Sequence, residues 1–329
     1  ATREAVALYD QSSFSKISVR GPDALAFLQS MCANEMNVAI GKMVYTPLLN
    51  DRGGFESDLT VIRLSADRFM VVTGSGQTTR DLDWLQRHVT PEMRVYIDDV
   101  SAQFCVLSLM GPNSLALMSR VCHEDLSPQA LPFAHTREID VGHAKVRAAR
   151  MSYVGGPGYE LYVPVEMTRH VYLALQSAGA DLGLRDAGYY ALDALRIERQ
   201  RRAWGAEIGP DETPFEAGLW AGVKLDKTID FKGKKALLLK KAQAAFKPEK
   251  KLVKVVVKDA HHYLWGGEPL SVAGQFVGEV TSAGWGYEAG RVVALGYIRG
   301  HWAQQDIQNL HAQAELWGVP VDVVIQEAA

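Results

Sequence analysis

The sequence predicts an α+β fold of ferredoxin-like modules followed by a small C-terminal β-barrel or jelly roll. Before residue 233, strand-like and helix-like segments alternate in β-α-β order, which is typical of ferredoxin-like modules. After residue 251, short apolar strands are joined by glycine-rich connections, as in small barrels. The lysine-rich stretch 233–251 is therefore the best domain boundary. With 329 residues and 47% hydrophobic content, the chain is long enough for two or three cores.

Apolar periodicity assigns the elements of the first part. Phe14–Arg20 alternates like a half-buried strand, and Gly21-Pro22-Asp23 begins the helix that follows. Leu59–Leu64 and Arg68–Thr73 are expected to pair as a hairpin, while Arg3–Leu8 is expected to be helical. The remaining elements of this part are a strand at Phe104–Leu109, a helix after Asn113, and a strand-helix unit from Lys145 to about Gly179.

The expected barrel begins after a run of lysines. Its strands are Leu252–Val257, Gln275–Val280 and Val292–Tyr297. The lysines before it lie in a helix-like stretch and its exit, and they form either a solvated helix face, the commoner case, or an anion-binding patch. They are Lys234, Lys235, Lys240, Lys241, Lys247, Lys250 and Lys251.

Composition and charge limit the classes of partner. A net charge of -3 and a pI near 6.3 indicate no basic stripe for a phosphate backbone, so no nucleic-acid partner is expected. No apolar run approaches about 18 residues, so no membrane partner is expected. Three scattered cysteines suit neither a disulfide framework nor a zinc site, and they favour a reducing, cytoplasmic location. The abrupt start of the chain leaves open that it is a piece of a longer protein.

The most specific stretch follows the helix-like segment Asp193–Glu198. This segment carries Arg196, and the polar loop Arg202–Glu216 that follows it is broken by glycine and proline. Trp204 lies eight residues after Arg196. A cation beside a flat aromatic side chain suits a ligand that has a ring and a carboxylate tail.

Two glycine-rich turns carry candidate acids. In Tyr45–Asp58, Gly53 and Gly54 are expected to supply positive φ, and Asp58 enters the next strand as either a catalyst or a turn device. Met151–Pro164 is a second hairpin, in which Tyr153 and Glu160 are close if the turn is tight. The plainer alternative is an ordinary hairpin with a solvated glutamate.

Several other motifs are incomplete. Gly74-Ser-Gly76 lacks the third glycine of a dinucleotide-binding turn, and no flavin or nicotinamide domain is visible. His261 and His262 are adjacent, so on a strand they point to opposite faces, and no ligand set for a metal surrounds them. The sequence also contains no Gly-x-Ser-x-Gly motif of a hydrolase.

A series of short motifs runs along essentially the whole chain. They are Leu8–Lys16, Gly21–Ala24, Tyr45–Asn50, Gly53–Asp58, Tyr153–Glu160, Leu195–Glu198, Thr213–Gly218, Phe231–Leu237, Val280–Ser282 and Ala294–Tyr297. Their order and spacing resemble the aminomethyltransferase (glycine-cleavage T-protein) family. Arg202–Glu207 and Leu264–Pro269 resemble the folate-binding half of dimethylglycine and sarcosine dehydrogenases more than T-protein itself.

This resemblance implies a three-domain cloverleaf around a central hole that holds tetrahydrofolate. It implies a discontinuous first domain (1–47 and 138–235), a ferredoxin-like second domain (48–137) and a C-terminal barrel (236–329). By position, Asp58 matches the catalytic carboxylate, while Tyr153 and Glu160 match residues that stack on and hydrogen-bond the pterin. Arg196 matches the cation that faces the folate tail, and Trp204 stands where T-proteins carry a tyrosine.

The chain departs from the family pattern at two places. Gly155-Gly156 followed by Pro157 replaces the usual Gly-Glu, and Gln200 replaces the glycine expected after the Arg196 helix. The first change alters the hairpin loop, and the second re-aims the loop that carries Trp204. Both put the identity of the substrate in doubt.

The resemblance implies a tetrahydrofolate-dependent one-carbon transferase that acts in N-demethylation. Tetrahydrofolate would capture a one-carbon unit from a small methylated amine or its iminium and yield 5,10-methylenetetrahydrofolate, with Asp58 as general base. A flavin-dependent oxidase on another subunit or domain would make the iminium. Two alternatives stay open: direct methyl transfer from a sulfonium, quaternary amine or methyl ether, and a non-catalytic folate-binding or regulatory module.

Overall fold

The computed structural model describes residues 1–242 and 248–328, which pack as two compact units. The first unit comprises Ala1–Leu48, Ser57–Tyr189 and Lys227–Phe231. The second comprises Leu49–Glu56, Tyr190–Asp226 and Lys232–Ala329. The three-domain division expected from the sequence stays a prediction.

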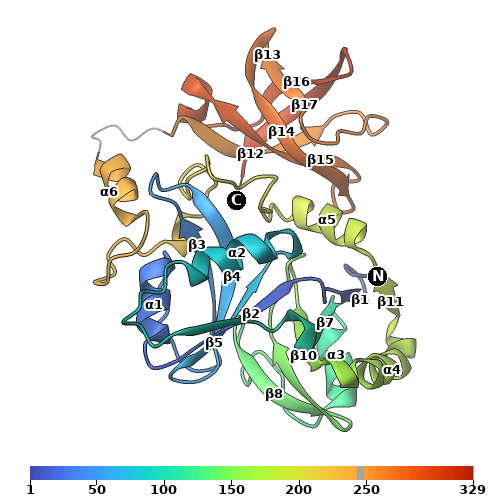
Figure 1. The fold of residues 1–329 in the computed structure, drawn as a ribbon. Coiled ribbons are helices and arrows are strands. Elements are labelled where there is room, and N and C mark those ends of the chain that lie inside the picture. The colour runs from blue at the N-terminus through green and yellow to red at the C-terminus, as the bar shows by residue number, and fades with distance from the viewer. Residues whose placement is uncertain (243–247, 329) are drawn as a thin grey trace. The chain divides into compact units, whose positions relative to one another are not determined.

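A five-stranded sheet forms half of the first unit (Figure 1). Its helices are α1 (Ala24–Met31) and α2 (Thr78–Gln86). Side chains from both helices and from one face of the sheet form a closed apolar core, which includes Phe27, Trp84 and Val61. In order across the sheet, the strands are β3 (Met43–Leu49), β4 (Phe55–Arg63), β5 (Arg68–Thr73), β2 (Ser15–Arg20) and β6 (Tyr96–Asp99).

A six-stranded sheet forms the other half of this unit. The helices α3 (Ser114–Val121) and α4 (Thr168–Gly179) contribute Leu117 and Val171 to a second core, on one face of this sheet. The strand order is β11 (Leu184–Ala187), β1 (Val6–Asp10), β7 (Phe104–Met110), β10 (Gly158–Pro164), β9 (Ala144–Ala149) and β8 (Thr136–Val141).

The two sheets of the first unit meet through a third apolar cluster. Met43, Ile62 and Met70 come from the five-stranded sheet, and Val106 and Tyr162 come from the six-stranded sheet. Because side chains alternate across a strand, these residues mark the face of each sheet that lies away from the helix-covered cores. We call this layer the inter-sheet layer.

A closed six-stranded barrel dominates the second unit (Figure 1). Its interior is filled by apolar residues such as Val255, Val280 and Ile325. Around the barrel, the strands are β12 (Lys250–Val257), β15 (Arg291–Arg299), β14 (Gln275–Gly286), β13 (Pro269–Val272), β16 (Leu310–Leu316) and β17 (Val319–Glu327). The same unit contains α5 (Tyr189–Glu198), whose first residue belongs to the first unit, and α6 (Lys234–Ala242). Ile197 of α5 packs with Val293 and Leu295 of β15.

The predicted fold class, α+β with a C-terminal barrel, is confirmed. The hairpin of β4 and β5 and the helices after Asp23 and Asn113 lie where the sequence placed them. The helix expected at Arg3–Leu8 is wrong, because the chain forms strand β1 from Val6. Strand β1 pairs with β11 and β7 along its two edges, and Val6 to Tyr9 are all buried, so both faces of the strand are covered and its apolar residues do not alternate.

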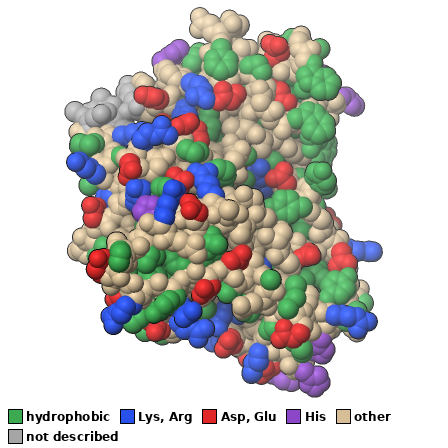
Figure 2. Space-filling view, viewed as in Figure 1, with side chains coloured by type: hydrophobic (Ala, Val, Ile, Leu, Met, Phe, Trp, Pro, Cys, Tyr) green, Lys and Arg blue, Asp and Glu red, His purple; other side chains and the backbone are tan. Residues whose placement is uncertain are grey.

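The described part of the lysine-rich stretch forms two elements. Lys234–Ala242 is helix α6, and Lys250 and Lys251 begin β12, where Lys250 is buried. Leu237 is buried, while Lys235 and Lys241 are exposed. Lys247 lies outside the described residues. On the face of the molecule drawn in Figure 2, basic and acidic side chains are interspersed, and exposed pairs such as Arg120–Asp181 show the same mixing.

The turn before β4 needs its two glycines for different reasons. Gly53 has φ of 81°, as expected, but Gly54 lies outside the left-handed region, so the expected positive φ is wrong there. A Cβ atom on Gly54 would lie 2.0 Å from the carbonyl oxygen of Pro210. Gly54 is therefore required by close backbone approach rather than by its φ.

We expect Gly54→Ala to destabilise the protein by about 2 kcal/mol, because the added methyl group forces the backbone at Pro210 to move. Gly76→Ala is the matched control, since a Cβ atom there meets nothing within 4 Å. Urea denaturation measures both variants. Equal stability of the two variants would contradict the close-approach explanation.

Candidate functional site

Asp58 lies in the middle of β4 on the face that belongs to the inter-sheet layer. Leu59 and Val61 point into the helix-covered core, and Ile62 points into the inter-sheet layer. Asp58 is four residues before Ile62, so strand alternation gives both side chains the same face. The half-buried Asp58 is thus held by a rigid strand rather than by the turn before it.

Asp58 has a raised pKa. Burial is the largest cause, and the neighbouring carboxylate of Asp81 adds to it, while a hydrogen bond from Tyr45 opposes both; the resulting pKa is about 6. The Tyr45 hydroxyl donates to Oδ2 of Asp58 at 3.2 Å. Asp81 is itself buried and accepts a hydrogen bond from the Ser57 hydroxyl at 2.8 Å. Asp58 can therefore gain or lose a proton near neutral pH.

Glu160 lies in the centre of the six-stranded sheet. In β10 it pairs with Ser108 of β7 and with Ala149 of β9, and its side chain is buried. Tyr162, two residues along the same face, donates its hydroxyl to Oε2 of Glu160 at 3.0 Å. Burial raises the pKa of Glu160 to about 7, despite this hydrogen bond.

Tyr153 lies in the connection between β9 and β10 and is half-buried. Gly155 and Gly156 have φ of 75° and 83°, which are conformations that favour glycine. Ala149, rather than Tyr153, is the residue that pairs with Glu160 across the hairpin. A role of Tyr153 beside Glu160 stays a prediction.

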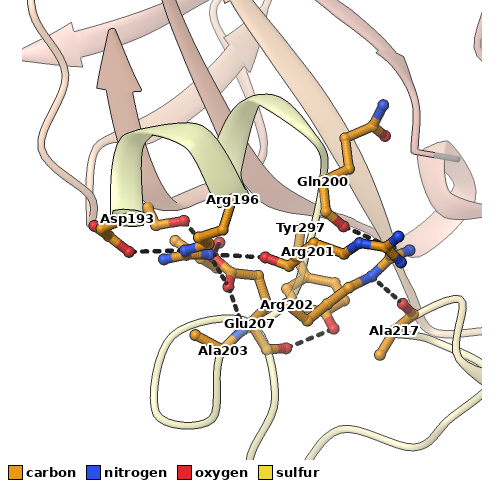
Figure 3. Close-up of polar contacts among 11 residues, drawn as sticks. Asp193, Arg196, Gln200, Arg201, Arg202, Ala203, Glu207, Ala217 and Tyr297 are labelled. Carbon is orange, nitrogen blue, oxygen red and sulfur yellow. Dashed lines mark hydrogen bonds and ion pairs between the residues drawn. The ribbon is translucent and has the colours of Figure 1, made fainter. Parts of the chain in front are cut away.

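Arg196 is enclosed by partners of its own unit (Figure 3). Its side chain is 4% exposed, and Nε donates to Asp193 at 2.7 Å. Nη1 donates to Oε2 of Glu207 at 2.7 Å and to the carbonyl oxygen of Arg201 at 3.1 Å. Two carboxylates therefore already neutralise the guanidinium that the sequence assigned to the folate tail.

Trp204 lies at the tip of the loop that follows α5. It is half-buried and packs against the small cluster formed by Phe55, Ile208 and Ala217. It also forms an isolated bridge with Ile208 across the turn at Gly205. The loop is thus held by contacts within its own unit.

The structure divides the five predicted residues between the two units. Asp58 and Glu160 lie on facing sheets of the first unit, which also contains Tyr153; Arg196 and Trp204 belong to the second unit. Sequence reasoning missed four residues: Tyr45, Asp81, Tyr162 and Glu207. Tyr162 had a usable signal, since residues two apart on a strand share a face. Tyr45 had one as well, since Tyr45 and Asp58 are the two ends of the predicted glycine-rich turn. Asp81 and Glu207 bind residues of other elements, such as Ser57 and Thr281.

The described residues contain no group of three or more histidine, cysteine, aspartate or glutamate side chains that could hold a metal ion. Within the same residues, no helix has both the length and the apolar character needed to span a membrane. Cys32, Cys105 and Cys122 carry free thiols. Burial raises the pKa of the Cys32 thiol to about 12.

We expect Glu160→Gln to change the pH dependence of stability. Because the folded state raises the pKa of Glu160 from 4.5 to about 7, it retains a proton that the unfolded chain loses, so stability falls as pH rises through this window. Glutamine does not titrate, so the variant gains about 3 kcal/mol relative to the parent between pH 4.5 and 8. Urea unfolding across this range measures the difference. Exposed Glu166→Gln is the control, and an identical pH profile for both variants would contradict the burial effect.

Two family models match the chain. The GCVT N-terminal domain matches residues 1–227, and the glycine cleavage T-protein C-terminal barrel domain matches residues 250–326. The second match coincides with the closed barrel. Together they extend over both units.

Two curated relatives match about 90% of the chain. The pyruvate dehydrogenase phosphatase regulatory subunit of Mus musculus is 35% identical over 303 residues, which are 90% of this chain and 34% of that protein. The 4-methylaminobutanoate oxidase (formaldehyde-forming) of Paenarthrobacter nicotinovorans is 39% identical over 295 residues, which are 90% of this chain and 35% of that protein. The chain thus spans about a third of the length of these relatives.

A solved structure supports the same assignment. The glycine cleavage system aminomethyltransferase T from Bartonella henselae superposes with a TM-score of 0.86 and 26% identity, over 99% of this chain and 86% of that chain. The fold is therefore that of T-protein. The chain belongs to the aminomethyltransferase (glycine-cleavage T-protein) family and is related to the dimethylglycine and sarcosine dehydrogenases.

Proposed function

We propose that this chain is a tetrahydrofolate-dependent one-carbon transferase that forms 5,10-methylenetetrahydrofolate during N-demethylation of a small methylated amine. The observation that carries the proposal is the pair Asp58 and Glu160. Both are carboxyl groups with raised pKa, and they belong to the two sheets that meet in the inter-sheet layer. Membership of the family and similarity to a formaldehyde-forming oxidase support it.

In this proposal Glu160 binds the aminopyrimidine edge of the pterin. A carboxylate accepts two parallel N–H bonds, which is a planar and charge-assisted fit. Tyr162 already donates to Oε2, so it fixes the orientation of the carboxylate before a ligand arrives. Burial disfavours the ionised form of Glu160 in the free protein. The N–H donors of a bound pterin would stabilise that ionised form and so offset the free-energy cost of burying it.

Asp58 is proposed to move a proton during transfer. Bound tetrahydrofolate supplies two nucleophilic nitrogens, and each gives up its proton as it bonds to the transferred carbon. The carbon–nitrogen bond of the donor iminium breaks, and both protons end on the departing amine, so the reaction is balanced without an oxidant. A carboxyl with a pKa of about 6 can accept one such proton and pass it on. Its negative charge also stabilises a cationic donor.

Tyr153 and Trp204 are each proposed to contact folate, and Arg196 is proposed to act on the Trp204 loop. Tyr153 offers a rigid amphipathic wall for the pterin, and Trp204 offers a flat aromatic surface. Arg196 is proposed to support the Trp204 loop, since Asp193 and Glu207 already bind its guanidinium.

The source of the one-carbon unit is proposed to be a flavin-dependent oxidase, as another subunit or as part of a longer chain. Two lines support this partner. One relative is by name an oxidase that forms formaldehyde, and this chain matches about a third of its length. An iminium made elsewhere would then be the donor.

A second candidate function is a non-catalytic folate-binding or regulatory module. Similarity to a phosphatase regulatory subunit favours it. The two candidates differ in turnover, because a regulatory module binds tetrahydrofolate without forming product. Product analysis also tests direct methyl transfer, which would yield 5-methyltetrahydrofolate and require no iminium.

We expect Asp58→Asn to lower single-turnover formation of 5,10-methylenetetrahydrofolate by at least about 100-fold, because a positioned acid or base contributes about 10²–10⁴ in rate. The probe donor is the iminium formed from formaldehyde and dimethylamine, and the rate without protein is subtracted. The variant should bind tetrahydrofolate with a Kd within a few-fold of the parent, as measured by intrinsic fluorescence.

Asp67→Asn is the matched control, because it makes the same chemical change at an exposed position between β4 and β5. It should leave the rate unchanged. Full turnover by Asp58→Asn would remove Asp58 from the reaction, and binding without turnover in the parent chain would favour the regulatory candidate.

A further inference from the structure

Glu207 is the centre of a buried polar network in the second unit. Its side chain is fully buried, and Oε2 accepts hydrogen bonds from Nη1 of Arg196 at 2.7 Å and from the backbone N–H of Ala203 at 2.9 Å. Oε1 accepts from the hydroxyls of Thr281, at 2.8 Å, and Ser282. Four donors thus satisfy one buried carboxylate, which is what a charge out of water requires.

The network depends on an irregularity in β14. Neighbouring residues of a regular strand point to opposite faces, so Thr281 and Ser282 would not ordinarily reach the same atom. A register shift between Val280 and Ser282 breaks this alternation. The bulge therefore directs both hydroxyls at Glu207.

The same residue ties the loop to the barrel through its backbone. The hydroxyl of Tyr297, in β15, donates to the carbonyl oxygen of Glu207 at 2.8 Å (Figure 3). Within the loop, the N–H of Gly205 donates to the carbonyl oxygen of Ile208 at 2.8 Å. Trp204 lies between Ala203 and Gly205, so its position follows from these contacts.

The loop also adopts conformations that need such support. Gln200, at the point where the family pattern has glycine, has φ of 55°, and Gly205 has φ of 86°. A non-glycine residue in the left-handed region costs about 1 kcal/mol or more and persists where its surroundings fix it. Here the Arg196 side chain binds the next carbonyl oxygen, that of Arg201, at 3.1 Å.

We propose that Glu207 is a positioning residue: it holds the Trp204 loop against the barrel in the form that binds folate, and Arg196 acts through Glu207 rather than by contacting the ligand. This inference rests on the proposed function for its ligand. Its structural part, the fastening of the loop, is independent of that ligand.

Glu207→Gln is the informative variant because glutamine keeps the shape of the side chain. Its carbonyl oxygen can still accept from Arg196 and Ala203, and its NH₂ group can donate to the hydroxyl oxygens of Thr281 and Ser282. The lost feature is the negative charge that balances Arg196. Glu288→Gln is the matched control, since Glu288 forms an exposed ion pair with Arg199 of the same loop region.

Hydrogen exchange and steady-state kinetics test the proposal. In Glu207→Gln, hydrogen exchange of the amides in residues 200–208 should accelerate at least about tenfold, while exchange in the barrel strands stays unchanged. The KM for tetrahydrofolate should rise at least about tenfold with kcat within about threefold. Glu288→Gln should match the parent in both respects.

A double-mutant cycle distinguishes an indirect role of Arg196, through Glu207, from direct contact of Arg196 with the ligand. If it acts through Glu207, Arg196→Met combined with Glu207→Gln weakens tetrahydrofolate binding no more than the stronger single change. Additive losses would mean direct contact with the ligand and would overturn this part of the proposal.

Failure of the proposal is distinguishable from failure of the proposed function. Unchanged loop exchange in Glu207→Gln overturns the positioning role, even if tetrahydrofolate binds normally. If the parent chain does not bind tetrahydrofolate, the proposed function and the folate-binding part of the Glu207 proposal are both overturned. Accelerated hydrogen exchange in the loop of Glu207→Gln would still show that Glu207 holds the loop.

Discussion

Removing a carboxylate from water is costly, and both units of this structure contain carboxyl groups that bear this cost. The two units meet it in opposite ways. Glu207 receives four donors, one of them a buried guanidinium, and so fastens a loop. Glu160 receives a hydrogen bond from a phenol and retains a pKa of about 7, so it remains ready to accept further donors. We therefore infer that Glu207 is structural and that Glu160 serves a ligand.

Much of the fold followed from the sequence, because its elements obey local periodicity. The β4–β5 hairpin and the barrel strand β12 lie where alternation placed them. Strand β1 did not, because it is buried on both faces between two partners and lacks the alternation of a half-buried strand. Gly54 shows the same limit, since its role depends on Pro210, far away in sequence.

Residues of the candidate site could be predicted where they belong to a sequence motif. They could not be predicted where their role depends on tertiary contacts. Asp58 and Glu160 came from the family pattern, but their raised pKa values arise from burial between two sheets. Asp193 stands three residues before Arg196 on one helix, so that ion pair had a local signal. The contact between Glu207 and Thr281 had no local signal, because Thr281 lies in β14 and reaches Glu207 through a bulge in that strand.

We infer that Glu160 is a buried carboxyl whose ionisation is coupled to folate binding. Carbon-13 NMR titration of the glutamate carboxyl groups, assigned by Glu160→Gln, tests it most directly. We expect a resonance that titrates near pH 7 in the free protein, and whose pKa falls when tetrahydrofolate binds and donates to the carboxylate. Titration at the ordinary carboxyl value near 4, or a pKa that tetrahydrofolate leaves unchanged, would contradict it.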